Sequence, residues 1–247
     1  MSYPQDQSSE KDLLLSSYHY DLPPELIAQR PVDGVNRHQS RLMVYNQKTD
    51  TVTHDYFYNL PNYLPADSLI VFNQSKVFPS RLLGNKKSGG KAELFFLSHE
   101  TNQNGSYPAL IKTRSKKNIG DEYTFAADMK VSVADIFSDG TFGVKVSLPA
   151  GFKNLLDYLE AHALIPIPPY IRKGESDEED KKNYQTVYSK HTGSVAAPTA
   201  GLHFTNDLLE KLKESNIERA FVTLHVGLGT FKPVTVAHLK DLSLIHI

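Results

Sequence analysis

The stretch GSVAAPTAGLHFT, residues 193–205, combines small residues, hydroxyl groups and one imidazole, that of His203. Glycine lets backbone N–H groups approach a ligand closely, and a helix N-terminus favours an anionic or nucleoside group. This interpretation gives four candidate substrate contacts: Ser194, Pro198, Thr199 and Gly201. The alternative is a tight loop before a capped helix, with His203 hydrogen-bonded to the backbone, and the pattern alone favours this alternative.

A second histidine, His225, begins the stretch HVGLGTF, residues 225–231. A GxG sequence after a strand is a feature of nucleotide-binding turns, and it would make Gly227, Gly229 and Thr230 substrate contacts. The stretch lacks the third glycine of a dinucleotide fold and the lysine of a phosphate-binding loop. A turn that simply ends a strand is therefore an equally good interpretation.

Composition and spacing exclude several classes of chemistry. The chain has no cysteine, which rules out disulfides, thiolate nucleophiles and cysteine-ligated zinc. Its ten histidines show none of the short spacings beside carboxylates that bind metals, so we expect no metal site. No nucleophile elbow supports a serine–histidine–aspartate triad, which disfavours a general hydrolase.

The segment from Lys76 to Lys117 is strongly basic inside a chain of net charge −1. It contains nine lysine and arginine residues against Glu93 and Glu100, with aromatic residues between them. Such a surface suits a nucleic-acid backbone, and a solvated lysine face is the alternative. The candidate nucleic-acid contacts are Arg81, Lys86, Lys87, Lys91, Lys112 and Arg114. We expect the compensating acidic stretch, residues 174–180, to be a solvated loop.

Arginines also cluster before the strand predicted in SRLMVYN, residues 40–46. Arg30, Arg37 and Arg41 could bind a phosphate or a carboxylate through paired hydrogen bonds. They could equally tie the N-terminal segment to the rest of the chain. We take Arg41 as a candidate substrate contact.

The elements that must position these residues differ between the middle and the ends of the chain. From Ser68 to Leu148, short β-rich runs beginning with SLIVFN are separated by turn signals, which predicts a small antiparallel barrel. The flanks alternate helical and extended patterns. We therefore predict an α/β domain, residues 1–65 and 150–247, with an inserted β-barrel domain, residues 66–149.

The last third contains the clearest helix and strand. Thr205 is a good N-cap for a helix over residues 206–215, and Asn216 is a good stop. The apolar run AFVTLHV, residues 220–226, predicts a strand covered on both faces. His203 and His225 would then lie at a helix N-terminus and at the carboxyl end of a strand, where α/β folds bind ligands.

The 247 residues are 40% hydrophobic and 22% charged, as in ordinary soluble globular proteins. The N-terminus has too short an apolar run for a signal peptide, and no run is long enough to span a membrane. We expect a cytoplasmic monomer without membrane association.

Seven motifs, in order, resemble the S-adenosylmethionine:tRNA ribosyltransferase-isomerase family of queuosine biosynthesis. They lie between Tyr20 and Val234 and read YDLPPELIAQRP with SRLMVYN, LIVFNQSKVFPSRLLG, KSGGKAELFFL, IPIPPYI, YQTVYSK, GSVAAPTAGLHFT and AFVTLHVGLGTFKPV. The resemblance implies an α/β domain with an inserted barrel. It also implies that S-adenosylmethionine donates its ribosyl group to the 7-aminomethyl-7-deazaguanine base at the tRNA wobble position. Rearrangement of the ribose would give epoxyqueuosine and release adenine and methionine, without a metal.

Within this resemblance His203 and His225 become the candidate catalytic base and acid. The positive charge of a sulfonium acidifies the adjacent carbon, so a neutral imidazole within reach could remove its proton. Departure of adenine needs a proton donor or hydrogen bonds to the base. The sequence leaves open which histidine has which role.

The chain departs from the family pattern in two places. Gln74 follows Asn73 where the family often has Asp or Asn. Family members also continue beyond HVGLGTFKPV with a further histidine- and glutamate-bearing segment and a GTTS-x-R motif, whereas AHLKDLSLIHI follows here. We therefore expect a C-terminally incomplete α/β domain. A catalytically impaired tRNA-binding fragment is the alternative function.

Overall fold

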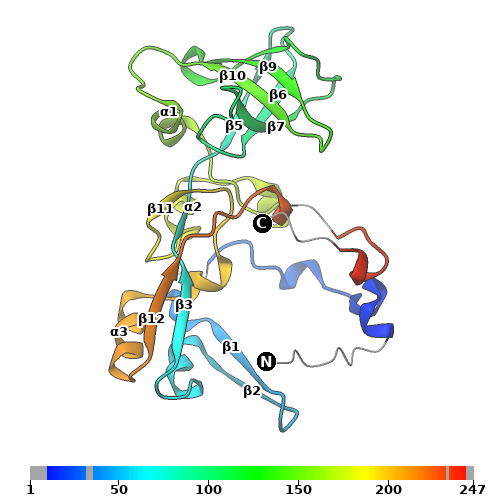
Figure 1. The fold of residues 1–247 in the computed structure, drawn as a ribbon. Coiled ribbons are helices and arrows are strands. Elements are labelled where there is room, and N and C mark those ends of the chain that lie inside the picture. Colours follow the sequence, from blue (N-terminus) through cyan, green and yellow to red (C-terminus); the bar gives the residue numbers. More distant parts are fainter. Residues whose placement is uncertain (1–9, 32–35, 232–233, 243–247) are drawn as a thin grey trace.

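The computed structural model describes residues 10–31, 36–231 and 234–242, with a β-barrel above and an α/β part below (Figure 1). Six antiparallel strands close the barrel in the order β10-β7-β6-β5-β8-β9. They are β5 (Arg81–Lys86), β6 (Lys91–Phe96), β7 (Tyr107–Lys112), β8 (Glu122–Thr124), β9 (Lys130–Ile136) and β10 (Phe142–Ser147). The predicted fold class, an α/β domain with an inserted small antiparallel barrel, is confirmed.

The hydrophobic core of the barrel continues into helix α1 (Leu155–His162). Leu155, Tyr158 and Leu159 are buried in the same cluster as the inward-facing side chains of the strands. The Tyr158 hydroxyl donates a hydrogen bond to the carbonyl of Ala126 at 2.7 Å, and burial raises the pKa of this tyrosine to about 12. The helix is therefore part of the barrel core.

Two parallel strand pairs join the middle of the chain to its last third. β3 (Leu69–Asn73) pairs with β12 (Glu218–Val222), and β4 (Ser75–Val77) pairs with β11 (His191–Ser194). The expectation that SLIVFN begins the barrel is therefore wrong. An apolar run indicates a strand but does not indicate its partner, which here comes from far along the sequence. The domain limits at residues 66 and 149 stay a prediction.

Helix α3 (Asn206–Glu214) forms where its pattern predicts a helix. The Thr205 hydroxyl oxygen accepts a hydrogen bond from the N–H of Leu208 at 3.2 Å, and Asn216 adopts a left-handed φ of 55°. The buried leucines of the helix pack against Phe72 of β3. Both helix ends and the buried stripe are confirmed.

The acidic stretch expected to be a solvated loop instead leads into a helix, α2 (Glu178–Asn183). The Asp177 side chain accepts a hydrogen bond from the N–H of Glu179, and the Asp180 side chain accepts one from the N–H of Asp177. Asp180 is only 6% exposed because its carboxylate pairs with Arg172. Acidic residues stabilise a helix N-terminus through its dipole, which explains why this acidic stretch begins a helix and is not a solvated loop.

The apolar run AFVTLHV is not a strand covered on both faces. β12 ends at Val222, and Phe221, Val222 and Leu224 are 44%, 47% and 49% exposed. Leu69 and Val71 of the neighbouring β3 are exposed as well. Val222 is on the same face as Leu69 and Val71, because it pairs with Asn73, which alternates with them along β3, and this face has no covering layer among the described residues. Phe221 is on the opposite face, where it stacks on the buried Phe72. A continuous apolar run therefore did not indicate a strand covered on both faces.

A hairpin and short 3₁₀ helices complete the described structure. The hairpin consists of β1 (Arg41–Asn46) and β2 (Thr51–Tyr56), paired antiparallel. The 3₁₀ helices near the candidate site are η4 (Arg37–Gln39), η5 (Phe57–Tyr63), η8 (Thr199–His203) and η9 (Leu228–Phe231). The others are η1 (Glu10–Leu13), η2 (Leu15–Tyr18), η3 (Pro24–Leu26), η6 (Ala126–Asp128), η7 (Arg172–Gly174) and η10 (Leu239–Asp241).

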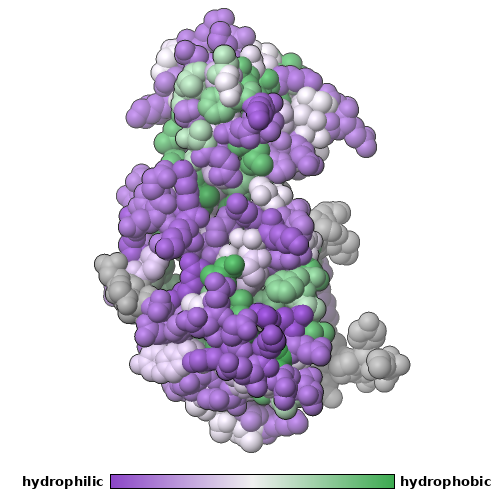
Figure 2. Space-filling model, turned by 90° about the vertical axis from the view of Figure 1, so that its left-hand side faces the viewer, coloured by the Kyte–Doolittle hydropathy of each residue, from purple (hydrophilic) through white to green (hydrophobic). Residues whose placement is uncertain are grey.

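The surface on the side that carries α3 is mostly hydrophilic, with apolar side chains gathered in separate areas of both halves (Figure 2). In the part of the chain that the structure describes, no helix is both long and apolar enough to cross a bilayer. Within the same part, no three histidine or carboxylate side chains lie together as metal ligands would.

Candidate functional site

His203 ends the 3₁₀ helix η8, and its half-buried ring is held on two sides. Its Nδ1 atom lies 2.9 Å from the hydroxyl oxygen of Ser40, which in turn donates to the carbonyl of Arg37 at 2.8 Å. The imidazole packs against the ring of Phe57, with 5.2 Å between ring centroids. The predicted candidate is thus hydrogen-bonded, as the alternative interpretation proposed, but to a side chain rather than to the backbone.

A histidine that the sequence analysis missed, His38, lies on the neighbouring turn η4. Its Nδ1 atom is 2.9 Å from the hydroxyl oxygen of Thr205, the residue that caps α3. Its ring meets Tyr58 edge-on. His38 and Ser40 therefore bring one turn against both ends of the segment from His203 to Thr205. The arginines beside His38 were a signal, but no motif pointed to the histidine itself.

Hydrogen bonds fix the turn η4 in place. Asn36 and Gln39 cap it reciprocally, and the N–H of Asn36 donates to the Gln39 side chain at 2.9 Å. The Arg37 guanidinium donates to the carbonyl of Gln185 at 2.8 Å, and burial lowers the pKa of this arginine. The sequence left two roles open for Arg37, binding an anion or tying the N-terminal segment to the rest of the chain. Its contact with Gln185 is of the second kind.

His225 is exposed, and its ring lies directly over the backbone of Gly193. A Cβ atom at Gly193 would be 2.8 Å from both Cε1 and Nε2 of the imidazole, so a side chain at this position requires the ring to move. His225 is also near enough to His99 to influence its charge; His99 is a half-buried residue that follows β6, and its ring packs on Phe78 with 5.4 Å between centroids. Burial lowers the pKa of His99, and the nearby His225 lowers it further. His99 is a second neighbour that sequence patterns did not reveal.

Ser194 joins the two small-residue motifs. Its buried hydroxyl donates to the carbonyl of Ala196 at 2.7 Å and accepts from the N–H of Val226 at 3.0 Å. The N–H of Val195 donates to the carbonyl of Val226 at 3.0 Å. The structure thus brings GSVAAPTAGLHFT and HVGLGTF side by side, and the Ser194 hydroxyl is already used for this purpose.

Gly201 is buried beneath the hydroxyl of Tyr188. A Cβ atom at this glycine would lie 2.0 Å from the Tyr188 oxygen and 3.0 Å from Cγ2 of Thr186. The Tyr188 ring packs on Phe72 and Phe204, and burial raises the pKa of its hydroxyl to about 12. The small residue is therefore required by packing next to His203.

The other predicted substrate contacts lie at the surface. Pro198 precedes η8, and Thr199, Thr230 and Arg41 are exposed. Gly227 and Gly229 are exposed as well, with open space where a Cβ would stand. Among the described residues, no hydrogen bond or ring contact joins His203 to His225, so the two candidate catalytic residues have separate surroundings.

The six candidate nucleic-acid contacts fall into two groups. Arg81 pairs with Glu93 at 2.6 Å, Lys86 with Asp121 at 2.9 Å, and Lys87 with Glu122 at 3.2 Å. Lys86 also holds the pKa of Asp121 below its ordinary value. The basic segment of the sequence analysis, Lys76 to Lys117, ends before Asp121 and Glu122, so its charge count did not include these two carboxylates. The remaining residues, Lys91, Lys112 and Arg114, are exposed on the barrel.

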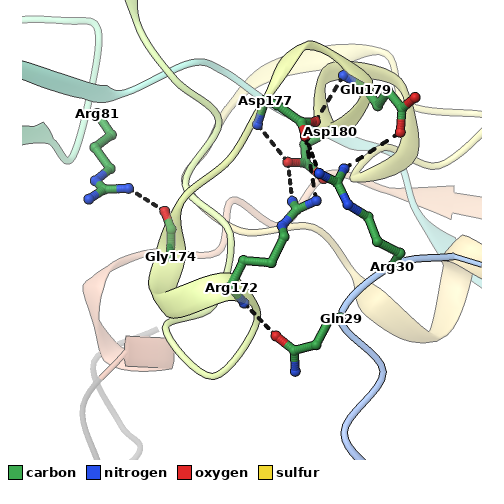
Figure 3. Close-up of polar contacts among 8 residues, drawn as sticks. All are labelled: Gln29, Arg30, Arg81, Arg172, Gly174, Asp177, Glu179 and Asp180. Atoms are coloured by element: carbon green, nitrogen blue, oxygen red, sulfur yellow. Dashed lines mark hydrogen bonds and ion pairs between the residues drawn. The ribbon is translucent and has the colours of Figure 1, made fainter.

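An ion-pair cluster ties the N-terminal segment, α2 and the barrel together, as Figure 3 shows. Arg30 contacts Asp177 and lies 3.5 Å from Glu179, while Arg172 pairs with Asp180. The backbone N–H of Arg172 donates to the Gln29 side chain at 2.6 Å, and Arg81 donates to the carbonyl of Gly174. Arg30 therefore ties the N-terminal segment to the body of the protein.

The fold and the site define a class of protein: an α/β domain with an inserted barrel and two histidine-bearing small-residue loops held side by side. A profile of the family described as "Queuosine biosynthesis protein" matches residues 15–246. The chain belongs to this family.

Similar proteins include two enzymes named S-adenosylmethionine:tRNA ribosyltransferase-isomerase. The one from Natranaerobius thermophilus is 41% identical over 229 residues, 92% of this chain and 64% of the relative. The one from Aquifex aeolicus is 42% identical over 227 residues, 92% of this chain and 65% of the relative. A crystal structure of S-adenosylmethionine tRNA ribosyltransferase from Thermotoga maritima is 31% identical, with a TM-score of 0.32 over 84% of this chain and 57% of that one. The chain thus spans less than two thirds of the length of these proteins.

Proposed function

We propose that this chain carries out ribosyl transfer and isomerisation on tRNA. S-adenosylmethionine is the ribosyl donor, and the acceptor is the aminomethyl group of a 7-deazaguanine base at the wobble position. The products are epoxyqueuosine in tRNA, adenine and methionine. One observation carries this proposal: relatives named for this activity are 41% and 42% identical over 92% of the chain.

The geometry of the two loops supports a nucleoside site. Ser194 holds the loops together, and the exposed Gly227 and Gly229 leave backbone open to a ligand. We propose that Pro198, Thr199, Thr230 and Arg41 contact the substrate from the surface of this region, and that Gly201 shapes the loop. Ser194 acts by holding Val226, because its hydroxyl is already hydrogen-bonded.

Two proton transfers are required of the protein. A base takes a proton from the carbon next to the sulfonium, where the positive charge stabilises the electron pair left behind. An acid, or a hydrogen-bond donor, assists the departure of adenine. We propose His203 and His225 for these roles, and no metal is needed for either step.

The exposed barrel residues Lys91, Lys112 and Arg114 are the proposed tRNA contacts. Long-range attraction from exposed cations favours binding of the phosphate backbone. Arg81 and Lys86 support the barrel surface through their ion pairs, and Lys87, directly after β5, pairs with Glu122. We also propose that the protein is monomeric and acts in the cytoplasm.

The test is adenine release from S-adenosylmethionine in the presence of tRNA that carries the precursor base. We expect release with this tRNA and none with tRNA that has an unmodified guanine at the wobble position. His203→Ala should lower the rate roughly 10²- to 10⁴-fold, the usual contribution of a general base. Salt-sensitive tRNA binding without adenine release would contradict the proposal and favour the alternative of a tRNA-binding protein without catalysis.

A further inference from the structure

The hydroxyl of Ser40 lies between a backbone carbonyl and the ring of His203. Its oxygen is 2.8 Å from the carbonyl oxygen of Arg37 and 2.9 Å from Nδ1 of His203. A serine hydroxyl has one proton to donate, and a carbonyl oxygen can only accept. The Ser40 proton therefore goes to Arg37, so the Ser40 oxygen accepts the hydrogen bond from Nδ1–H of His203.

We propose that Ser40 is a positioning residue that holds neutral His203 in the Nδ1–H form, with its lone pair on Nε2. Resting on the proposed function, this assigns the base role to His203. The C–H bond next to the sulfonium breaks, its electron pair stays on that carbon, and the proton bonds to Nε2. The resulting imidazolium keeps its Nδ1–H on Ser40, so the same hydrogen bond holds the ring before and after the transfer.

The surroundings hold the ring in one orientation. Phe57 packs on it at a centroid distance of 5.2 Å and an interplanar angle of 44°. Ser40 directly follows η4, which the Asn36–Gln39 cap and the Arg37 contact to Gln185 keep in place. A base that is fixed in orientation and tautomer needs no reorganisation before the proton moves.

The neighbouring His38 is a natural comparison. Its Nδ1 atom is also 2.9 Å from a hydroxyl, that of Thr205. The Thr205 oxygen accepts from the N–H of Leu208, so its proton is not committed to a carbonyl. Thr205 can therefore donate to His38 or accept from it, and this network leaves the tautomer of His38 open.

The direct test is the tautomer itself, measured on the whole chain without substrate. Protein with ¹⁵N-labelled histidine is studied by long-range ¹H–¹⁵N NMR at alkaline pH, and His203→Gln identifies the signals. We expect a protonated-type Nδ1 and a lone-pair-type Nε2 at His203. In Ser40→Ala this preference should be lost while the His38 signals stay unchanged. A protonated Nε2 at His203 in the wild-type protein would overturn the proposal.

Kinetics test the consequence for catalysis. Ser40→Ala should lower kcat for adenine release about tenfold or more, because a base that is no longer held in one tautomer loses part of its contribution to the rate. The KM for S-adenosylmethionine should change little, because Ser40 acts on the base and not on substrate binding. Ser40→Thr keeps the hydroxyl and should restore most of the rate and the Nδ1–H signature. Ser68→Ala is the matched control, because it removes another serine-to-carbonyl hydrogen bond, to Pro65, that does not involve His203.

The outcomes separate this inference from the proposed function. If the wild-type protein releases no adenine, the proposed function fails and the NMR result still decides the tautomer. If Ser40→Ala is as active as the wild type, or Ser40→Thr restores nothing, the positioning role is contradicted. Circular dichroism of each variant verifies that the fold is retained.

Discussion

At the scale of single residues, the small side chains of the candidate site are required by contact. His225 lies on the backbone of Gly193, and Tyr188 lies on that of Gly201. The hydroxyl of Ser194 connects the first loop to Val226. The run of small residues is therefore a closely packed wall that holds a histidine on each of two loops.

Gly193→Ala tests this packing. The new Cβ atom would be 2.8 Å from the His225 ring, which must move. We expect the free energy of unfolding to fall by about 1–3 kcal/mol, as for other overpacked sites, and adenine release to fall with it. Urea denaturation and the adenine assay measure the two effects.

The stability control for this variant is Gly227→Ala, because nothing lies within 4 Å of a Cβ at that position. It should unfold at nearly the wild-type urea concentration. Equal stability and equal activity of Gly193→Ala and the wild type would show that the contact with His225 has no importance.

At the scale of elements, the strands of the barrel pack so closely that one of them needs a glycine. In β5, a Cβ at Gly84 would lie 2.4 Å from the carbonyl oxygen of Thr124 and 2.5 Å from the Phe125 ring. Phe125 belongs to the core that also buries α1. The barrel and its helix thus depend on a close approach of β5 to the last residue of β8 and to Phe125, which follows it.

Gly84→Ala should therefore destabilise the barrel. Backbone oxygen cannot move aside as a flexible side chain can, so we expect a loss of about 1–3 kcal/mol in the free energy of unfolding. The measurement is chemical denaturation followed by near-ultraviolet circular dichroism. Gly90→Ala, near the start of β6 where nothing lies within 4 Å of a Cβ, should be close to neutral. Similar losses for both variants would argue against this packing explanation.

The ion pair between Arg30 and Asp177, the N-cap residue of helix α2, should make stability depend on pH. Arg30 holds the pKa of Asp177 below its ordinary value of 3.8. Because the folded pKa is depressed, the stabilisation is complete above the ordinary value and is lost as the pH falls through the folded value. We expect the stability difference between wild type and Arg30→Gln to be constant from neutral pH to about pH 5 and to shrink below 3.8.

Urea denaturation across this pH range measures the difference. Lys182→Gln, on the same helix α2, is the control, since Lys182 has no ion pair among the described residues and should show no such pH dependence. A difference between wild type and Arg30→Gln that persists unchanged well below pH 3.8 would exclude Asp177 as the group responsible.

At the scale of the whole molecule, charge is more evenly balanced than the sequence count indicates. The chain has a net charge of −1, and the barrel carries its own counter-charges at Glu93, Asp121 and Glu122. Of the six candidate contacts, the three without such an ion pair lie on the strands β6 and β7 and directly after β7. These three residues are therefore the candidate contacts whose charge none of these barrel acids offsets.

Lys91→Gln, Lys112→Gln and Arg114→Gln should each weaken tRNA binding. If each side chain contacts a phosphate, the slope of log affinity against log salt falls by about 0.7 to 0.9 per variant, depending on the strandedness of the contacted RNA. Fluorescence titrations at several salt concentrations measure the slope. Lys48→Gln, on the turn between β1 and β2, should leave it unchanged. Unchanged slopes for all three barrel variants would remove this surface from tRNA recognition.

The sequence by itself determined the local elements and the order of the motifs. Caps, stops and leucine spacing predicted α3, and turn signals between β-rich runs predicted the barrel, because such patterns act over a few residues. The motifs identified the family from residues alone. The histidines of the two loops were found in the same way, because small residues around an imidazole are visible locally.

Only the tertiary structure decided which distant residues meet. The Asn73 side chain hydrogen-bonds the backbone of Leu224, 151 residues away, and extends the pairing of β3 with β12. Ser40 meets His203 across 163 residues, and that contact decides the tautomer of the ring. Strand pairing, ion pairing and ring packing depend on three-dimensional proximity, which no local pattern of residue types encodes.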